Sequence, residues 1–341
     1  MVLAGHLGAD DRGGPRPAST LPSPCARRNP GVEGRPRVDC PSSGSRIVDV
    51  VTHAIPAVNG DVLQVDDYGP LDGVPVLVHA GSPGSRRMFR PDADVAARVH
   101  GLRLLSYDRP GYGGRPRQEG RAMSAGVHDV QRIAEALGIN RLAVWGFSGG
   151  GSYALACAAM LPDLVTGAAV FATFAPYGSA GLDFCEGMSP AYAHEVELFF
   201  TDRPLARANW RRDAEEFGPQ LSTAAGWMER WGERAGADDA HSQEVAEHLA
   251  AIWCDAMTDG DDGWWDDWSA VLSPWGCDLT RIAIPVRLWH GVHDTAVPVA
   301  QGRWLAAHVP GLIAHFGADE DHTNVESNNR EAAYAWLRGL R

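Results

Sequence analysis

Apolar and polar positions follow a regular pattern from about residue 47 onward, and this pattern predicts most of the secondary structure. Two alternating runs, 47–51 and 61–66, flank an Asn59-Gly60 turn and predict an antiparallel pair of strands. Further along, apolar runs of strand length alternate with helix-forming segments. The predicted strands are 74–79, 102–107, 141–145, 166–172, 284–290 and 312–316, and the predicted helices are 88–99, 123–137, 152–161, 299–308 and 328–340. Strands that alternate with helices predict an α/β fold with a mostly parallel, doubly wound sheet.

Two segments depart from this alternation. Residues 1–45 are rich in Pro, Gly, Ser and Arg and have no periodic apolar pattern, which predicts a disordered N-terminal arm. Residues 176–277 are helical in pattern and contain eight of the twelve tryptophans. We therefore expect an α/β core formed by 46–175 and 278–341, with 176–277 inserted as a helical cap, or lid, over the site.

Composition narrows the classes of function. The chain has 43 acidic and 30 basic residues and a net charge of −13, which argues against nucleic acid or an anionic membrane as partner. It contains no lysine, which excludes Schiff-base lysine chemistry and the phosphate-loop lysine. The six cysteines form no Cys-x-x-Cys pair, and no apolar run has the length of a membrane span. We expect a cytoplasmic protein with reduced thiols; no oligomeric state is indicated.

The sequence Gly146-Phe147-Ser148-Gly149-Gly150 lies between a predicted strand and a predicted helix. In such a strand, sharp turn and helix, the serine takes a strained backbone angle and its hydroxyl is exposed as a nucleophile. Gly146 and Gly150 leave room where strand and helix approach each other. The amide of Gly149, at the start of the helix, is placed to stabilise a developing oxyanion.

A serine nucleophile needs a base that is oriented by a third group. His322 follows the last predicted strand, and Asp294 follows the strand before it. The carboxyl ends of parallel strands meet at one edge of a sheet, so both side chains are expected near Ser148. His290, His293 and His315 are alternative bases, and Asp294 is alternatively a turn-forming residue. The strand 166–172 is followed by no carboxylate in 173–176, which favours Asp294 as the acid.

These motifs, in this order, resemble the α/β-hydrolase superfamily, especially the capped bacterial branch with esterases, proline-iminopeptidase-like enzymes and cofactor-free haloperoxidase-like enzymes. The resemblance covers nearly all of the chain after about residue 47 and is carried by 81–84, 108–113, 146–150, 289–298 and His322. It implies Ser148 as nucleophile, His322 as base and Asp294 as the orienting acid, and oxyanion amides from Ser82 and Gly149. No metal or cofactor is implied.

Two departures from the resemblance concern the site itself. Many relatives have His-Gly where this chain has Ala80-Gly81, so one supporting side chain of the oxyanion loop is missing. Many have glycine before the catalytic histidine, whereas Asp321 stands here. Asp321 and the neighbouring Glu320 and Asp319 either raise the pKa of His322 or face water.

The remaining candidate residues concern the walls of the site. Phe147, Arg109, Tyr112 and Trp265 are candidate substrate-binding residues; for Arg109 and Tyr112 a role in shaping one wall is favoured over a chemical one. The acidic run 259–267 is interpreted as a solvated loop, with a site for a cationic amine as the alternative.

The function predicted from the sequence is a serine hydrolase that cleaves an ester or amide of a small to medium, partly apolar molecule through an acyl-enzyme. Two alternatives stay open. One is an aminopeptidase for N-terminal proline or similar amines, in which acids such as Asp261 and Asp266 bind the amine. The other is a non-hydrolytic binding protein on the same scaffold.

Overall fold

A computed structural model describes residues 50–57, 60–88, 93–231 and 240–340. The predicted N-terminal arm and the Asn59 turn position lie outside these residues. One sheet of eight strands organises the chain, in the order β1-β2-β4-β3-β5-β6-β7-β8. Only β1–β2 and β2–β4 pair antiparallel; the other strands are parallel. The strands are β1 (Val51–Pro56), β2 (Val62–Tyr68), β3 (Val74–His79), β4 (Leu102–Tyr107), β5 (Leu142–Phe147), β6 (Val165–Phe171), β7 (Val286–Gly291) and β8 (Ile313–Gly317).

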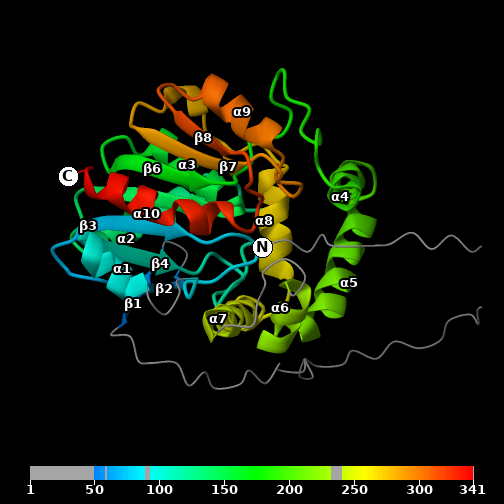
Figure 1. Ribbon diagram of the computed structural model, residues 1–341, viewed down its shortest axis with the longest axis horizontal. Helices are drawn as coiled ribbons and strands as arrows, with labels where there is room; N and C mark the ends of the chain where they lie inside the picture. Colours follow the sequence, from blue (N-terminus) through cyan, green and yellow to red (C-terminus); the bar gives the residue numbers. More distant parts are fainter. Residues whose placement is uncertain (1–49, 58–59, 89–92, 232–239, 341) are drawn as a thin grey trace, which may run out of the picture.

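Helices cover both faces of the sheet. Helices α1 (Ala93–His100) and α10 (Val325–Arg338) pack on one face, against β4 and against β6 and β7. Helices α2 (Ala125–Ala136), α3 (Gly149–Met160) and α9 (Val299–His308) cover the other. The predicted doubly wound α/β architecture is therefore confirmed (Figure 1).

An insertion of helices separates β6 from β7, as predicted. It contains α4 (Pro190–Thr201), α5 (Arg203–Leu221), α6 (Ala224–Trp231), α7 (Ala240–Ala256) and α8 (Asp262–Val271). In Figure 1, α8 stands along one edge of the sheet, α4 and α5 lie beyond it on the side away from the sheet, and α6 and α7 lie below its lower end. The predicted limits of core and cap stay predictions. None of the described helices combines the length and apolar character needed to cross a membrane.

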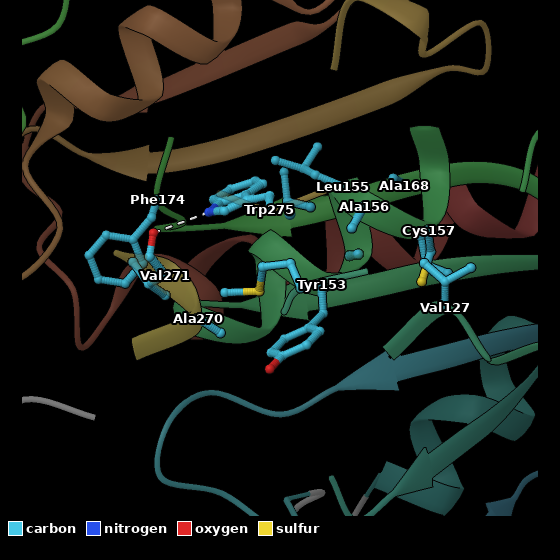
Figure 2. Packing of buried hydrophobic residues seen from close by; sticks show 14 of the residues in the cluster. Val127, Tyr153, Leu155, Ala156, Cys157, Ala168, Phe174, Ala270, Val271 and Trp275 are labelled. Carbon is cyan, nitrogen blue, oxygen red and sulfur yellow. Dashed lines mark hydrogen bonds between the residues drawn. The ribbon is translucent and has the colours of Figure 1, made fainter. Parts of the chain in front are cut away.

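Helix α3 is buried on all sides. Its residues Tyr153 to Ala158 have almost no exposed surface, because the sheet, α2 and α8 surround the helix. Figure 2 shows Val271 and Trp275, from the end of α8 and the loop after it, packed beside Tyr153, Leu155 and Phe174. The base of α8 is thus part of the main hydrophobic core. Its position relative to the catalytic edge of the sheet is fixed by burial of apolar surface.

The first strand differs from its prediction. Residues 47–49 lie outside the described part, and β1 begins at Val51, where the predicted strand ends. Only Ile55 in β1 is buried, so the apolar pattern carries little information there. Instead, pairing with β2 extends the strand: the Thr52 hydroxyl donates to Asp66 at 2.7 Å, and the His53 ring contacts Asp67 at 2.9 Å.

A histidine with no exposed surface lies at the end of β3. The ring of His79 contacts the Tyr107 hydroxyl at 3.1 Å and stacks on Tyr153. Burial, reinforced by the positive charge of Arg109, lowers the pKa of His79 to about 3. The folded protein therefore keeps this ring neutral under conditions in which the unfolded chain, with a pKa near 6.5, binds a proton.

We expect acid to destabilise the protein through His79. The folded pKa lies below the unfolded one, so the stabilisation is complete above pH 6.5 and is lost as pH falls toward the folded value of about 3. Each pH unit in this window costs about 1.4 kcal/mol, or roughly 2 kcal/mol between pH 6.5 and pH 5. Urea unfolding at several pH values measures this loss. The variant His79→Asn should show a shallower pH dependence; an unchanged slope would contradict the assignment.

Candidate active site

Ser148 occupies the turn between β5 and α3 with φ 54° and ψ −128°. A non-glycine residue at positive φ is strained, as the sequence predicts for a nucleophile at this turn. A Cβ on Gly146 would lie 2.5 Å from the carbonyl oxygen of Gly150, and one on Gly150 would lie 2.2 Å from the carbonyl oxygen of His79. Strand and helix therefore approach too closely for any side chain, which confirms the predicted reason for both glycines.

The structure brings His322 and Asp294 to Ser148. The Ser148 hydroxyl lies 3.1 Å from His322 Nε2, and His322 Nδ1 lies 2.7 Å from Asp294 Oδ2. Because a carboxylate only accepts, Nδ1 carries the proton and Nε2 is free to accept the serine proton. Asp294 Oδ1 accepts the backbone amides of Ala296 and Val297 at 2.9 and 2.8 Å, which fix the carboxylate.

The other histidines considered as bases are placed elsewhere. His293 and His315 are exposed. His290 is fully buried, and its Nε2 donates to the Val297 carbonyl at 2.7 Å. Burial lowers the pKa of His290, although Asp294 acts in the opposite direction. His290 is thus a neutral structural residue beneath the loop that carries Asp294.

Asp321 shapes the loop of His322. Its carboxylate accepts the backbone amide of Thr323 at 2.7 Å and the Thr323 hydroxyl at 2.6 Å. In return, its own amide donates to the side chain of Asn324 at 2.9 Å. The glycine found here in many relatives is therefore replaced by a residue that fixes the turn through side-chain hydrogen bonds.

The residues predicted to supply oxyanion amides lie next to each other. A Cβ on Gly149 would meet the Ser82 hydroxyl at 2.7 Å and the Ser82 amide nitrogen at 4.0 Å. Both residues border the same pocket as Ser148 and His322. Gly149 is the first residue of α3, where a backbone N–H has no partner within the helix.

The pocket encloses about 500 Å³ of empty space, including the open solvent at its mouth. Beyond the catalytic candidates, its wall is mainly aromatic and aliphatic. The lining side chains of this kind are Phe174, Tyr192, Trp210, Trp264, Trp268, Val271, Ala296 and Val297. The indoles of Trp210 and Trp268 stack with centroids 5.2 Å apart. Asp267 is the one carboxylate among the lining residues in the described part of the chain.

The four candidate substrate-binding residues lie outside this lining. Phe147 packs against the His322 ring with centroids 5.0 Å apart. Arg109 and Tyr112 donate to Asp267 at 2.6 and 2.8 Å. Trp265 packs against Phe199. None of the four borders the pocket, and the tryptophans that do are Trp210, Trp264 and Trp268.

The interpretation of 259–267 as a solvated loop holds only at its start, where Asp259 is exposed in a turn, and is wrong from Asp262 onward. Asp262 to Asp267 form the first part of α8, and the side chains of Asp266 and Asp267 are 2% and 1% exposed. Asp266 binds Arg117 at 2.8 Å, and Asp267 binds Arg109 and Arg121 at 2.6 and 2.7 Å. The burial of these acids is stabilised by arginines far away in the sequence, which the local pattern cannot reveal.

Sequence reasoning missed Asp267 as part of the pocket. Trp264, Asp267, Trp268 and Val271 have the spacing i, i+3, i+4, i+7 and therefore share one face of α8. All four line the pocket. The helical spacing of the aromatic residues was the signal that could have identified this face.

The charge of Asp267 is set by its partners. Burial alone would raise the pKa of this carboxyl, but Arg109 and Arg121 outweigh burial and hold the pKa well below its usual range. Burial raises the pKa of Tyr153 to about 12 and that of Tyr112 well above its ordinary value. Both phenols are therefore protonated donors to an ionised carboxylate. Within the described residues, no group of three or more His, Cys, Asp or Glu is arranged to hold a metal ion.

Comparisons with known proteins bear on the family and the fold. The family model described as "Alpha/beta hydrolase family" matches residues 76–335. A non-heme chloroperoxidase of Streptomyces lividans is 26% identical over 255 residues, which cover 71% of this chain and 82% of that protein. Among solved structures, an esterase from Exiguobacterium antarcticum has a TM-score of 0.59 at 18% identity, covering 85% of this chain and 98% of that one. An enol-lactonase from Burkholderia xenovorans LB400 has a TM-score of 0.56 at 21% identity, with the same coverage.

The structural matches have low sequence identity and therefore support the fold alone. The family model covers most of the chain and therefore identifies the family. The strand order, the turn at Ser148 and the insertion after β6 agree with it. The chain belongs to the α/β-hydrolase family.

Proposed function

We propose that this protein is a serine hydrolase that cleaves carboxylic esters of small to medium, apolar or aromatic molecules through an acyl-enzyme. The observation that carries the proposal is the hydrogen-bonded chain from Ser148 through His322 to Asp294, at 3.1 and 2.7 Å, which opens into an aromatic pocket. An alcohol held in this way loses its proton to the imidazole as it attacks a carbonyl carbon.

The reaction proceeds in two halves. The oxygen of Ser148 attacks the ester carbonyl while His322 Nε2 takes its proton, and Asp294 stabilises the imidazolium that forms. The amides of Ser82 and Gly149 bind the oxyanion. The tetrahedral intermediate then collapses, the C–O bond to the alcohol breaks, and His322 returns the proton to that alcohol. Water repeats the sequence on the acyl-serine and releases the acid.

The lining of the pocket favours an uncharged substrate. Indole and phenyl rings form much of its wall, and such rings favour apolar or aromatic groups. Asp267 is the lining carboxylate, and two arginines already neutralise it.

The pairing of the α8 acids with arginines weighs against the aminopeptidase alternative. Binding a free N-terminus requires a carboxylate that can accept from an ammonium group. Asp261, suggested for this role, binds Arg207, and Asp266 binds Arg117. Neither residue lines the pocket. The acids of α8 therefore have arginine partners within the protein.

A panel of chromogenic substrates tests the proposal. The wild-type protein should hydrolyse 4-nitrophenyl acetate, butyrate and benzoate, and should turn over L-proline 4-nitroanilide far more slowly. A fluorophosphonate probe should label the protein, whereas a non-hydrolytic binding protein with a dead serine would stay unlabelled. Preferred cleavage of the prolyl anilide would establish the aminopeptidase instead, and absence of both turnover and labelling would refute the proposal.

A further inference from the structure

The loop that carries the oxyanion amide of Ser82 is held from behind by Arg109. The guanidinium donates to the carbonyl oxygen of Ala80 at 2.6 Å and to that of Gly81 at 3.0 Å. This is the loop that lacks the histidine found in many relatives, because Ala80 stands at that position. A side chain from the turn after β4 therefore supports the loop in place of the missing one.

The contact with Gly81 has a direct consequence for the oxyanion amide. The Gly81 carbonyl and the Ser82 N–H belong to one planar peptide unit and point in opposite directions. An arginine that fixes the carbonyl therefore also fixes the direction of the N–H. A charged donor on the carbonyl oxygen polarises the peptide as well, which strengthens the N–H as a donor to an oxyanion.

Asp267 of α8 binds both parts of this arrangement. Its Oδ2 accepts from the Arg109 guanidinium at 2.6 Å and from the Ser82 hydroxyl at 2.6 Å. One carboxylate oxygen thus contacts the residue that supplies the amide and the arginine that orients it. Arg109 and Asp267 are 2% and 1% exposed, so the hydrogen bond between them is shielded from water.

The carboxylate is itself fixed by further donors. Oδ1 accepts from Arg121 at 2.7 Å and from the Tyr153 hydroxyl at 3.0 Å, and Tyr112 donates to Oδ2 at 2.8 Å. The end of α8 packs into the main core beside α3 (Figure 2). Asp267 therefore occupies one defined position, although it belongs to the inserted helices and not to the sheet.

We propose that Asp267 is a positioning residue for the oxyanion site: through Arg109 and the Ser82 hydroxyl it directs the Ser82 amide toward the developing oxyanion. The inference rests on the proposed function, in which Ser148 is the nucleophile. The inserted segment then has two roles in the site. Besides forming the pocket wall, α8 completes the oxyanion site that the core loop alone does not hold in place.

Two neighbouring acids provide a matched test. Asp266 lies on the same helix and is 2% exposed. It binds Arg117 through two hydrogen bonds of 2.8 Å and contacts Arg121 at 3.5 Å, but none of these hydrogen bonds reaches the oxyanion loop. Asp267→Asn should lower kcat for 4-nitrophenyl butyrate by about 10²-fold, with KM changed by about 3-fold or less. Asp266→Asn should lower the resistance to urea, because Arg117 loses its buried partner, while kcat stays within about 3-fold of the wild-type value.

A transition-state analogue adds a readout that a purely structural role would not change. A trifluoromethyl ketone forms a tetrahedral oxyanion on the serine, so its affinity should fall in Asp267→Asn in parallel with kcat. The affinity for the product acid, which forms no tetrahedral adduct, should stay close to that of the wild type. A loss of affinity for both molecules in equal measure would overturn the proposal.

A smaller substitution keeps the test decisive if Asp267→Asn does not fold. Ser82→Ala removes the hydroxyl that binds Asp267 and keeps the amide; it should lower kcat about 10-fold. Wild-type kcat in Ser82→Ala would overturn the proposal.

Failure of the proposed function would look different. If Ser148→Ala retains the esterase activity, or the wild type has none, the nucleophile is wrong and the role of Asp267 falls with it. If Ser148→Ala is inactive while folded Asp267→Asn and Ser82→Ala retain wild-type kcat, only the positioning role is refuted.

Discussion

Replacing Ser148 by alanine is expected to lower kcat for 4-nitrophenyl butyrate by roughly 10⁶-fold, because the oxygen that forms the acyl-enzyme is removed. The loss should appear in kcat with little change in KM, since the pocket wall is left intact. Steady-state kinetics with active-site titration measure it. Alanine also carries a Cβ, so the strained φ of 54° remains and the variant should resist urea about as well as the wild type.

Ser152 offers the matched control for this substitution. It lies one turn further along α3, is fully buried, and its hydroxyl contacts Thr173 at 3.4 Å, away from the pocket lining. Ser152→Ala should retain most of the activity. Residual turnover above about 1% of wild type in Ser148→Ala would instead point to another nucleophile, because removal of this group leaves far less in serine hydrolases.

The second large effect is expected at Asp294. Asp294→Asn should lower kcat about 10⁴-fold, because the amide can donate to His322 Nδ1 and so favours the tautomer whose Nε2 is protonated and cannot accept from serine. The Asn oxygen can still accept the amides of Ala296 and Val297, so the loop should keep its conformation. Kinetics and urea unfolding of the same preparation separate the two effects.

Asp319 serves as the control for charge alone. It is an exposed acid close to His322 in the sequence, and Asp319→Asn removes one negative charge from that loop without touching the triad. Its kcat should stay within about 2-fold of wild type, as is usual for exposed charges. A loss in Asp294→Asn no larger than this control would show that the carboxylate does not orient the histidine.

The strands in the middle of the sheet could be predicted because they are buried on both faces. The limits of β3, β4 and α9 agree with their predicted ranges, since continuous apolar runs bounded by turns define them. The same logic placed Ser148, Asp294 and His322 at one edge, because parallel strands bring the loops after their carboxyl ends together. At β1, where only Ile55 is buried, the pattern was weak and the prediction missed the strand.

The substrate side of the site was less accessible to sequence reasoning. Its wall combines residues from the loop after β6, from α4, α5 and α8, and from the loop after β7, which no local pattern connects. The acids of α8 were misread because their arginine partners, such as Arg109 and Arg121, come from the turn and loop that follow β4. Burial of a charge depends on a partner in space, and sequence distance gives no indication of it.

The most direct measurement is the identity of the covalent intermediate. Wild-type protein mixed with 4-nitrophenyl butyrate and quenched in acid within milliseconds should gain the mass of one butyryl group, and peptide mapping should place that group on Ser148. Release of 4-nitrophenol without any acylated protein, or acylation of a different residue, would contradict the account.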